Sequence, residues 1–274
     1  MREPPRTDED HCVTASEETL TGRALVEAGS PVAGSMSRAA ATVVFEPEAA
    51  AVRVDARFAA CLRAAAGEAA ALTVPRERVR AGAALAFAVE YAATADRGGR
   101  PVRSDDWFAP RAGHRSVAEE VTETVVASAR RSTDERRVRH LGYLVAESAV
   151  SPDIDADLVV RALRSAESLS WRQLAVLAGV GRRERAPLPM APLEDAPRAW
   201  SAWAAREDVT DLQCAGLLDL PVAPARPGSV LPRLRMADLR LTRRGVLVHR
   251  LLVLDLVHDD AVTAALADLG LPRS

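Results

Sequence analysis

The stretch that decides the fold of this 274-residue chain reads STDERRVRHLGYLVAESAVSPDIDADLVVRALRSAESLSWRQLAVLAGVG, from Ser132 to Gly181. Three helix start signals and three apolar stripes follow one another in it with almost no loop between them. Short connections of this kind favour helices that pack against one another. The stretch therefore predicts three consecutive, packed helices at the centre of a mainly α-helical fold.

The first of these helices is predicted to have Thr133 as its N-cap, because threonine caps helices well and two acids follow it. Asp134 and Glu135 would then occupy the first turn, where the positive end of the helix dipole favours acids. Apolar residues at helical spacing predict its buried face: Val138, Leu141, Leu144 and Val145.

The second helix is expected to begin after the break at Pro152, with Asp155 as its cap. Asp157 stands four residues before Arg161, the spacing of a supportive ion pair on the exposed side. Its apolar side consists of Leu158, Val159, Ala162, Leu163 and Ala166.

The third helix opens with Ser170 and Gln173, which have the spacing of a capping box. Gly179 and Gly181 are expected to end it. Its apolar residues are Trp171, Leu174, Leu177 and Ala178.

Upstream of this centre the sequence predicts more helices. One spans the alanine-rich segment 47–72, and another begins at Pro75 with Val79, Ala83, Phe87 and Tyr91 on one face. Ser116 and Glu119 form a second capping box, ahead of an apolar side made by Val117, Val121, Val125 and Val126. Segment 39–45 is either strand or helix, and residues 1–37 are expected to be mobile.

Downstream, residues 182–197 are proline-rich and predict an extended loop. Two short helices are expected at 198–206 and 208–218, followed by strands at 218–223 and 234–241 around a turn at 224–232. Thr242 is predicted to cap an apolar helix, and Asp259 to begin a last one.

Composition excludes several classes of protein. The chain has no Lys, no Asn and a single Ile, at position 154, while Ala and Arg abound, which indicates a GC-rich bacterial genome. Abundant Arg is therefore no nucleic-acid signal by itself, and a net charge of −2 provides no global basic field. Cys12, Cys61 and Cys214 are odd in number and widely spaced, which fits neither disulfides nor zinc and predicts a reducing, cytoplasmic setting.

Membrane and secretory signals are also missing from the sequence pattern. No charge-free apolar run approaches the roughly 18 residues of a membrane span. The opening MREPPRTDEDHC is acidic, whereas a secretory signal begins with positive charge followed by an apolar core. We therefore expect no membrane span and no secretory signal.

Two sequence steps carry a resemblance to a known fold. Ala215-Gly216-Leu217-Leu218 follows the predicted helix pair, and Leu241-Thr242-Arg243-Arg244-Gly245 enters the next helix. This order resembles the winged-helix domain of bacterial regulators of the MarR and PadR type, over about residues 170–255. Segment 116–179 is also similar to helical segments of poorly characterised bacterial proteins such as the abortive-infection alpha family.

Together with the composition and the helix pattern upstream, the resemblance implies a particular organisation. A mobile segment 1–37 would precede a multi-helix domain at 38–169, and residues 170–274 would form a winged-helix-like domain with a small β-hairpin and C-terminal helices. The recognition helix would be 208–218 and the wing 224–241. Because the same fold often serves as a docking module, it does not settle function.

The charges of this unit leave two interpretations open. Asp208 and Asp211 make the recognition helix acidic, which disfavours insertion into a DNA groove. The wing and the next helix are basic and can hold a phosphate backbone, or they can pair with the acidic helix or with a partner. The arginines concerned are Arg226, Arg233, Arg235, Arg240, Arg243, Arg244 and Arg250, against the single acid Asp238.

A second basic group flanks the first central helix and is a candidate anion or partner patch. It lies among Asp134 and Glu135, so a solvated ion-pair surface is the competing interpretation. Its members are Arg130, Arg131, Arg136, Arg137 and Arg139.

No catalytic constellation stands out. His11 beside Cys12, His140, His249 and the run His258-Asp259-Asp260 all have simpler structural explanations as tail, core or capping residues. The loop from Ser104 to Trp107 combines acids with an aromatic, which fits either a functional loop or a tryptophan that anchors a turn.

These observations lead to one functional expectation and one alternative. We expect a non-enzymatic adaptor or scaffold protein, without cofactor or metal, that binds another protein or a second copy of itself through helical faces and charged patches. The alternative is a winged-helix transcriptional regulator that binds duplex DNA with its basic wing.

Overall fold

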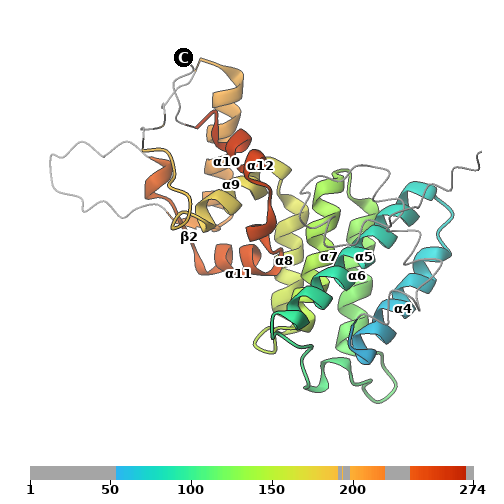
Figure 1. Ribbon diagram of the computed structural model, residues 1–274. Helices are drawn as coiled ribbons and strands as arrows, with labels where there is room; N and C mark the ends of the chain where they lie inside the picture. The colour runs from blue at the N-terminus through green and yellow to red at the C-terminus, as the bar shows by residue number, and fades with distance from the viewer. Residues whose placement is uncertain (1–53, 191–192, 194–197, 220–234, 270–274) are drawn as a thin grey trace, which may run out of the picture.

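The computed structural model describes residues 54–190, 193, 198–219 and 235–269. In this part the chain is mainly α-helical, with one small antiparallel pairing of two strands (Figure 1). The predicted mobile segment 1–37, segment 39–45 and the turn 224–232 lie outside the described residues. The order of elements in the described residues confirms the predicted mainly α-helical fold class.

The first half of the described chain is a bundle of neighbouring helices, with α4 and α5 drawn in blue and teal in Figure 1. Helix α5 is buried on nearly all sides because alanine and glycine let its neighbours approach closely. The bundle consists of α4 (Ala56–Ala70), α5 (Pro75–Arg97), α6 (Val117–Arg131), α7 (Glu135–Ala149) and α8 (Ala156–Ser168).

The second half contains shorter helices and the strand pair. In the strand pair Leu218 faces Leu241 and Asp219 faces Arg240. Its elements are α9 (Trp171–Gly181), α10 (Trp200–Cys214), β1 (Leu218–Asp219), β2 (Arg240–Leu241), α11 (Arg243–Leu251) and α12 (Asp259–Leu266). Single 3-10 turns lie at Asp106–Phe108, Met236–Asp238 and Leu254–Leu256.

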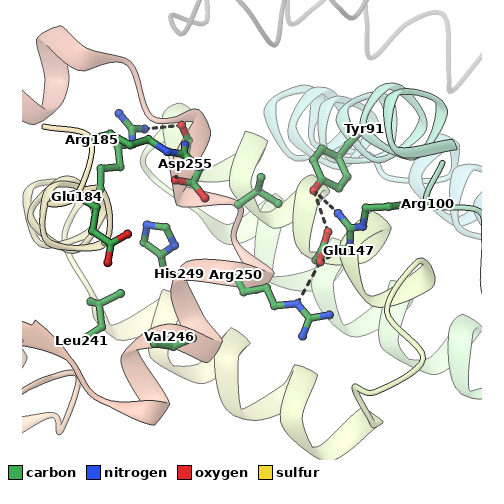
Figure 2. Close-up of a pocket in the computed structure, with 13 residues that line it drawn as sticks. Tyr91, Arg100, Glu147, Glu184, Arg185, Leu241, Val246, His249, Arg250 and Asp255 are labelled. Carbon is green, nitrogen blue, oxygen red and sulfur yellow. Dashed lines mark hydrogen bonds and ion pairs between the residues drawn. The ribbon is translucent and has the colours of Figure 1, made fainter. Parts of the chain in front are cut away.

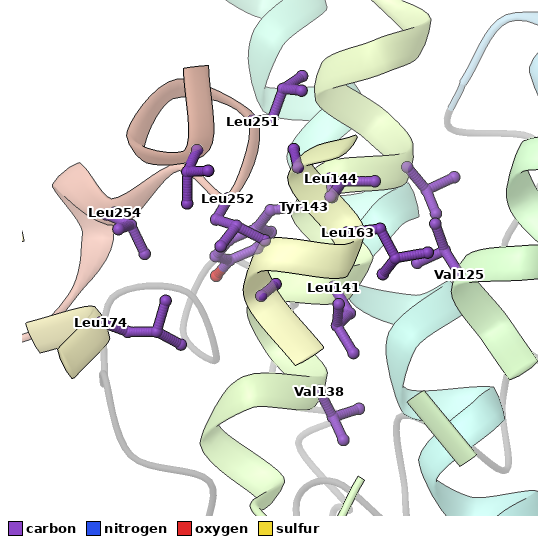
Figure 3. Packing of buried hydrophobic residues seen from close by; sticks show 14 of the residues in the cluster. Val125, Val138, Leu141, Tyr143, Leu144, Leu163, Leu174, Leu251, Leu252 and Leu254 are labelled. Atoms are coloured by element: carbon purple, nitrogen blue, oxygen red, sulfur yellow. The ribbon is translucent and has the colours of Figure 1, made fainter. Parts of the chain in front are cut away.

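One continuous core runs through both halves. Figure 3 shows Leu141 and Leu144 of α7 beside Leu163 of α8, with Leu251 and Leu252 approaching from the end of α11. The faces predicted from helical spacing in the central stretch are buried, apart from Leu158 and Trp171, which are partly buried against the core, and this confirms the interpretation of the apolar stripes. The domain boundary at residue 169 stays a prediction, since buried side chains from both sides belong to the same cluster.

Close packing of α5 against α7 depends on one glycine. A Cβ at Gly142 would lie 2.3 Å from the Ala84 carbonyl oxygen and 2.8 Å from Phe87 Cβ. No side chain fits in that space, so glycine allows the two backbones to touch. The Phe87 and Tyr143 rings then meet edge to face at 6.1 Å beside this contact.

Most predicted helix starts are confirmed, and two are wrong. The helix expected over 47–72 begins only at Ala56, where the Asp55 side chain caps it. Both capping boxes form, at Ser116 and at Ser170, and Asp155 caps α8. The first central helix is capped by Asp134 and not by Thr133, because the Asp134 carboxylate accepts a hydrogen bond of 2.9 Å from the Arg136 amide. A carboxylate also carries the charge that the helix dipole favours there, which a hydroxyl lacks.

Several predicted boundaries differ from the structure in the second half. The two short helices expected at 198–206 and 208–218 are a single helix, α10, because no proline or glycine interrupts Trp200–Cys214. Helix α9 runs through Gly179 and ends at Gly181. The second predicted strand is shortened to β2 by the 3-10 turn at Met236–Asp238, and its partner β1 is described only to Asp219.

The two steps that carry the winged-helix resemblance lie against each other. Gly216 adopts a positive φ of 67°, and its carbonyl accepts a hydrogen bond of 2.7 Å from the Thr242 hydroxyl. A Cβ at Gly245 would lie 2.1 Å from the Leu217 carbonyl oxygen. The start of α11 is thereby held directly on β1, and a side chain at position 245 would push the two apart.

Within the described residues, no helix is both long enough and apolar enough to cross a membrane.

Candidate functional site

A charged cleft of about 600 Å³ lies where the bundle meets the second half of the chain. Figure 2 shows its walls: Tyr91 and Arg100 come from the end of α5 and the loop after it, Glu147 from α7, and His249 and Arg250 from α11. The segments that form it are far apart in the sequence. Only the tertiary structure brings them together, and we refer to it below as the charged cleft.

Glu147 is the centre of one wall. Its side chain is only 3% exposed, and a buried carboxylate must be hydrogen-bonded to be tolerated. It accepts hydrogen bonds from the Tyr91 hydroxyl at 2.8 Å, from Arg100 Nη2 at 2.7 Å and from the Ser151 hydroxyl at 2.9 Å. Burial and the Glu147 charge raise the pKa of Tyr91, and the hydrogen bond to Glu147 raises the pKa of Arg100.

Arg250 joins the second half of the chain to this wall. Its guanidinium donates to both carboxylate oxygens of Asp153, at 2.6 and 2.8 Å, and to the Ser151 hydroxyl at 2.9 Å. Its Nε also lies 3.4 Å from Glu147 Oε1. The hydrogen bond from Arg250 lowers the pKa of Asp153. Arg250 belongs to the basic group predicted for the wing and the next helix, and in the structure it connects α11 with the bundle.

The opposite wall is built on His249 and Gly181. A Cβ at Gly181 would lie 2.1 Å from His249 Nε2, so the imidazole rests directly on the glycine backbone. Burial lowers the pKa of His249, against the raising effect of the Asp255 charge. Its Nε2 has no hydrogen-bond partner among the described residues. The expectation of a core or edge histidine is confirmed by this burial.

Val253 supplies a strained backbone to the cleft wall. It has φ 48° and ψ 50°, the left-handed conformation that glycine usually adopts after a helix end. For a β-branched residue this conformation is a rare outlier, and it costs on the order of 1–2 kcal/mol. Packing of Val253 against the core holds it in place.

The cleft mixes charges of both signs. Its arginines are Arg100, Arg182, Arg185 and Arg250, and its acids are Glu147, Glu184 and Asp255. Ion pairs and carbonyl contacts engage all four arginines. In the described part of the chain, no cluster of three or more His, Cys, Asp and Glu side chains could hold a metal ion. The arrangement accounts for the attachment of one half of the molecule to the other.

The predicted wing arginines are mostly bonded within the chain. Arg235 pairs with Asp238 at 2.7 Å, Arg240 donates to the Ala237 and Leu239 carbonyls at 2.9 Å, and Arg244 donates to the Ala215 carbonyl at 3.0 Å. Arg243 is exposed. Arg226 and Arg233 lie outside the described residues.

The acids of the predicted recognition helix find partners on α9. Arg172 forms an ion pair with Asp208, and the Gln173 amide donates to Asp211 at 3.2 Å. These contacts hold α10 against α9. One interpretation paired these acids with the arginines of the wing. In the structure their partners lie on α9.

The predicted patch around the first central helix is not one surface. Arg130, Arg131 and Arg136 form ion pairs with Glu77, Glu167 and Asp134, and Arg137 contacts the Leu169 carbonyl. Placing Arg139 in the patch is wrong, because this side chain is 2% exposed. Its guanidinium lies 5.4 Å from the centroid of the Phe87 ring, since this part of α7 packs against α5.

The loop with acids and an aromatic has a structural explanation. Trp107 is buried, and the Arg103 guanidinium lies 4.4 Å from its ring. Arg103 also donates to Asp105 at 2.8 Å and to the Ile154 carbonyl at 2.7 Å. The tryptophan anchors the turn, as one of the two interpretations expected.

His140 is a fully enclosed core residue. Its Nδ1 lies 2.7 Å from the Leu252 carbonyl oxygen, and burial lowers its pKa to about 4. The ring is therefore neutral near pH 7, and its Nδ1–H donates to that carbonyl. His258 caps α12, whereas His11 lies outside the described residues.

Sequence reasoning missed the most exposed aromatic residues of the described chain. Trp200 is 82% exposed and Trp203 is 46% exposed, and their rings meet edge to face at 5.9 Å. Both stand in the first turns of α10, whose buried residues all come later, from Ala205 onward. The signal was present as two tryptophans three residues apart, the spacing of one helical face.

The fold and these sites define a mainly helical protein with a charged junction and an exposed aromatic helix end. Comparisons with protein-family models, with curated proteins and with solved structures find no significant match. The resemblances to winged-helix regulators and to the abortive-infection alpha family remain predictions.

Proposed function

We propose that this chain is an interaction protein, an adaptor or scaffold, that docks onto another protein through the N-terminal end of α10. The observation that carries the proposal is the exposed pair Trp200 and Trp203. Exposure of a large aromatic side chain to water is unfavourable, and its burial in a complex is favourable. An indole buries about 150–250 Å² when a partner covers it. Tryptophan is also among the residues most enriched at binding hot spots.

The geometry of the pair favours one mode of binding. Residues at i and i+3 project from the same side of a helix, which is how an amphipathic helix places anchors in an apolar groove. The edge-to-face contact of the two rings fixes their relative orientation before binding. Less rotamer freedom is then lost when a partner closes around them.

The neighbouring turn indicates the chemistry of the partner. Glu207 stands four residues after Trp203, on the same exposed side of α10. Asp208 and Asp211 have partners on α9, but Glu207 has no ion pair within the described residues. The groove that fits this face is apolar where the indoles enter and carries a basic residue at one end.

The proposal is tested by site-specific photocrosslinking in the native host followed by affinity measurement. A photoreactive residue at Trp203 is expected to capture one defined protein, and the same residue at the exposed Val74 is not. Isothermal titration of the purified pair should then show that Trp200→Ala/Trp203→Ala binds at least about 30-fold more weakly, the loss expected for a hot spot. Val74→Ala should bind like the native chain.

Two outcomes would count against the proposal. One is equal affinity of the captured protein for the native chain and the double variant. The other is crosslinking only to a second copy of this chain, which would make the aromatic face a self-association surface. DNA binding by a basic wing remains the alternative expectation, and titration of the chain with a short DNA duplex bears on it.

A further inference from the structure

A second hollow, of about 450 Å³, lies between α8 and α11 on the outside of the junction. It is lined by Arg161 and Arg164 of α8, by Arg244 of α11, and by Asp157 and Val160. Three guanidinium groups therefore share a concave surface with one carboxylate. We call this surface the arginine hollow.

Within the described residues, Asp157 is the one acid that lines the arginine hollow beside its three arginines, so the hollow keeps a net positive charge. The guanidinium groups of Arg161 and Arg164 have no hydrogen bond or ion pair among the described residues, so the pair expected between Asp157 and Arg161 is not formed. Arg244 donates to the Ala215 carbonyl at 3.0 Å and to the Ser165 hydroxyl at 3.1 Å. These neutral acceptors orient the guanidinium of Arg244 without cancelling its charge.

The N-terminal end of α11 lies beside the hollow and adds to its positive electrostatic potential. Arg243 and Arg244 occupy the first turn of α11, where the positive end of the helix dipole disfavours cations. Thr242 caps that end with a neutral hydroxyl, which accepts from the Gly245 amide at 2.9 Å. Helices α7 and α8 have an acid at this position, Asp134 and Asp155, whereas α11 has neither an acidic cap nor an acid in its first turn. A bound anion would interact favourably with the positive end of the helix dipole and would reduce the repulsion among the clustered guanidinium groups.

We infer that the arginine hollow binds a phosphate group. A phosphate offers several acceptor oxygens in different directions, so one group can be contacted from α8 and from α11 at once. Guanidinium forks match these oxygens in pairs, and the hollow contains arginine and no other cation. The phosphate comes either from a small free compound or from a duplex backbone. The inference is independent of docking through α10.

The test titrates the full-length chain at low salt with two probes, inorganic pyrophosphate and a short DNA duplex. Arg161→Ala/Arg164→Ala is compared with Arg76→Ala/Arg111→Ala, which removes the same charge from exposed positions outside the hollow. The hollow variant should bind the effective probe roughly tenfold or more weakly, because it loses charge-assisted hydrogen bonds. The control variant should stay close to the native affinity. Circular dichroism confirms that both variants keep the native helix content.

The two probes distinguish the sources of the phosphate. Binding of pyrophosphate that depends on the hollow supports a small phosphate compound. Binding of duplex alone, with a salt slope about 2 units shallower in the hollow variant, supports a nucleic-acid backbone. The inference is overturned if neither probe binds, or if the control variant loses as much affinity as the hollow variant.

Discussion

Single residues decide how the two halves of this molecule meet. Glu147 gathers Tyr91, Arg100 and Ser151 around one buried carboxylate, and Arg250 reaches the same group from α11. Gly142, Gly181 and Gly245 each require glycine, because at each of them a Cβ would collide with a neighbouring element. Such positions cannot be recognised from propensity, because glycine inside a helix is unfavourable and glycine at a helix end serves equally well as a cap without any close contact.

The contact between Gly181 and His249 yields a prediction at this scale. Gly181→Ala should lower the free energy of unfolding by about 1–3 kcal/mol, the usual cost of overpacking, because the new methyl group meets the imidazole. The additional change His249→Ala should recover part of the loss. Urea unfolding of the single and double variants measures both effects.

Gly67→Ala is the matched control, because nothing lies within 4 Å of a Cβ there. This change should stabilise α4 by up to about 1 kcal/mol through helix propensity alone. Equal effects of the two glycine substitutions would show that the His249 contact is unimportant.

At the scale of elements, local signals and tertiary contacts contribute differently. The capping boxes at Ser116 and Ser170 and the cap at Asp155 are satisfied within a few residues, so their sequence spacing predicts them. The strands at Leu218–Asp219 and Arg240–Leu241 are too short for any periodicity, and they depend on contacts around Thr242. The two short helices expected at 198–206 and 208–218 are one helix, and its contacts with α9 through Asp208 and Asp211 depend on tertiary packing.

The capping box of α9 gives a prediction about an element. Ser170→Ala removes the hydroxyl that accepts a hydrogen bond from the backbone N–H of Gln173, at 3.2 Å in the native chain. The expected cost is about 1 kcal/mol, which corresponds to a fall of roughly 2–4 °C in Tm for a chain of this size. Ser104→Ala, at an exposed loop position, should leave Tm unchanged. Differential scanning calorimetry of both variants makes the comparison, and equal Tm values would contradict the role of this cap.

At the scale of the whole molecule, one continuous core ties stability to the protonation of buried groups. His140 belongs to α7 and reaches the Leu252 carbonyl at the end of α11, so it lies between the two halves. Burial lowers its pKa in the folded chain to about 4, below the ordinary histidine value of 6.5. The unfolded chain therefore binds more protons at mildly acidic pH, and stability falls as pH decreases below 6.5.

This linkage predicts a measurable pH dependence. Between about pH 7.5 and about pH 5.5 the native chain should lose roughly 1–1.5 kcal/mol of unfolding free energy through His140. His140→Gln should flatten this dependence, leaving the part due to His249, whose pKa burial also lowers. His114→Gln, at an exposed position, should keep the native slope. A slope in His140→Gln as steep as in the native chain would refute the assignment.

The sequence by itself determined the class and positions of the central helices, because helix caps and apolar stripes act over four or fewer residues. For the loop at Trp107 the sequence left two interpretations open, and the burial of the tryptophan beside Arg103 decides between them. The tertiary structure decided the sites. The burial of Arg139, the junction at Glu147, the exposed face at Trp200 and the arginine hollow each depend on which helices become neighbours, and that is a property of packing between segments far apart in the chain.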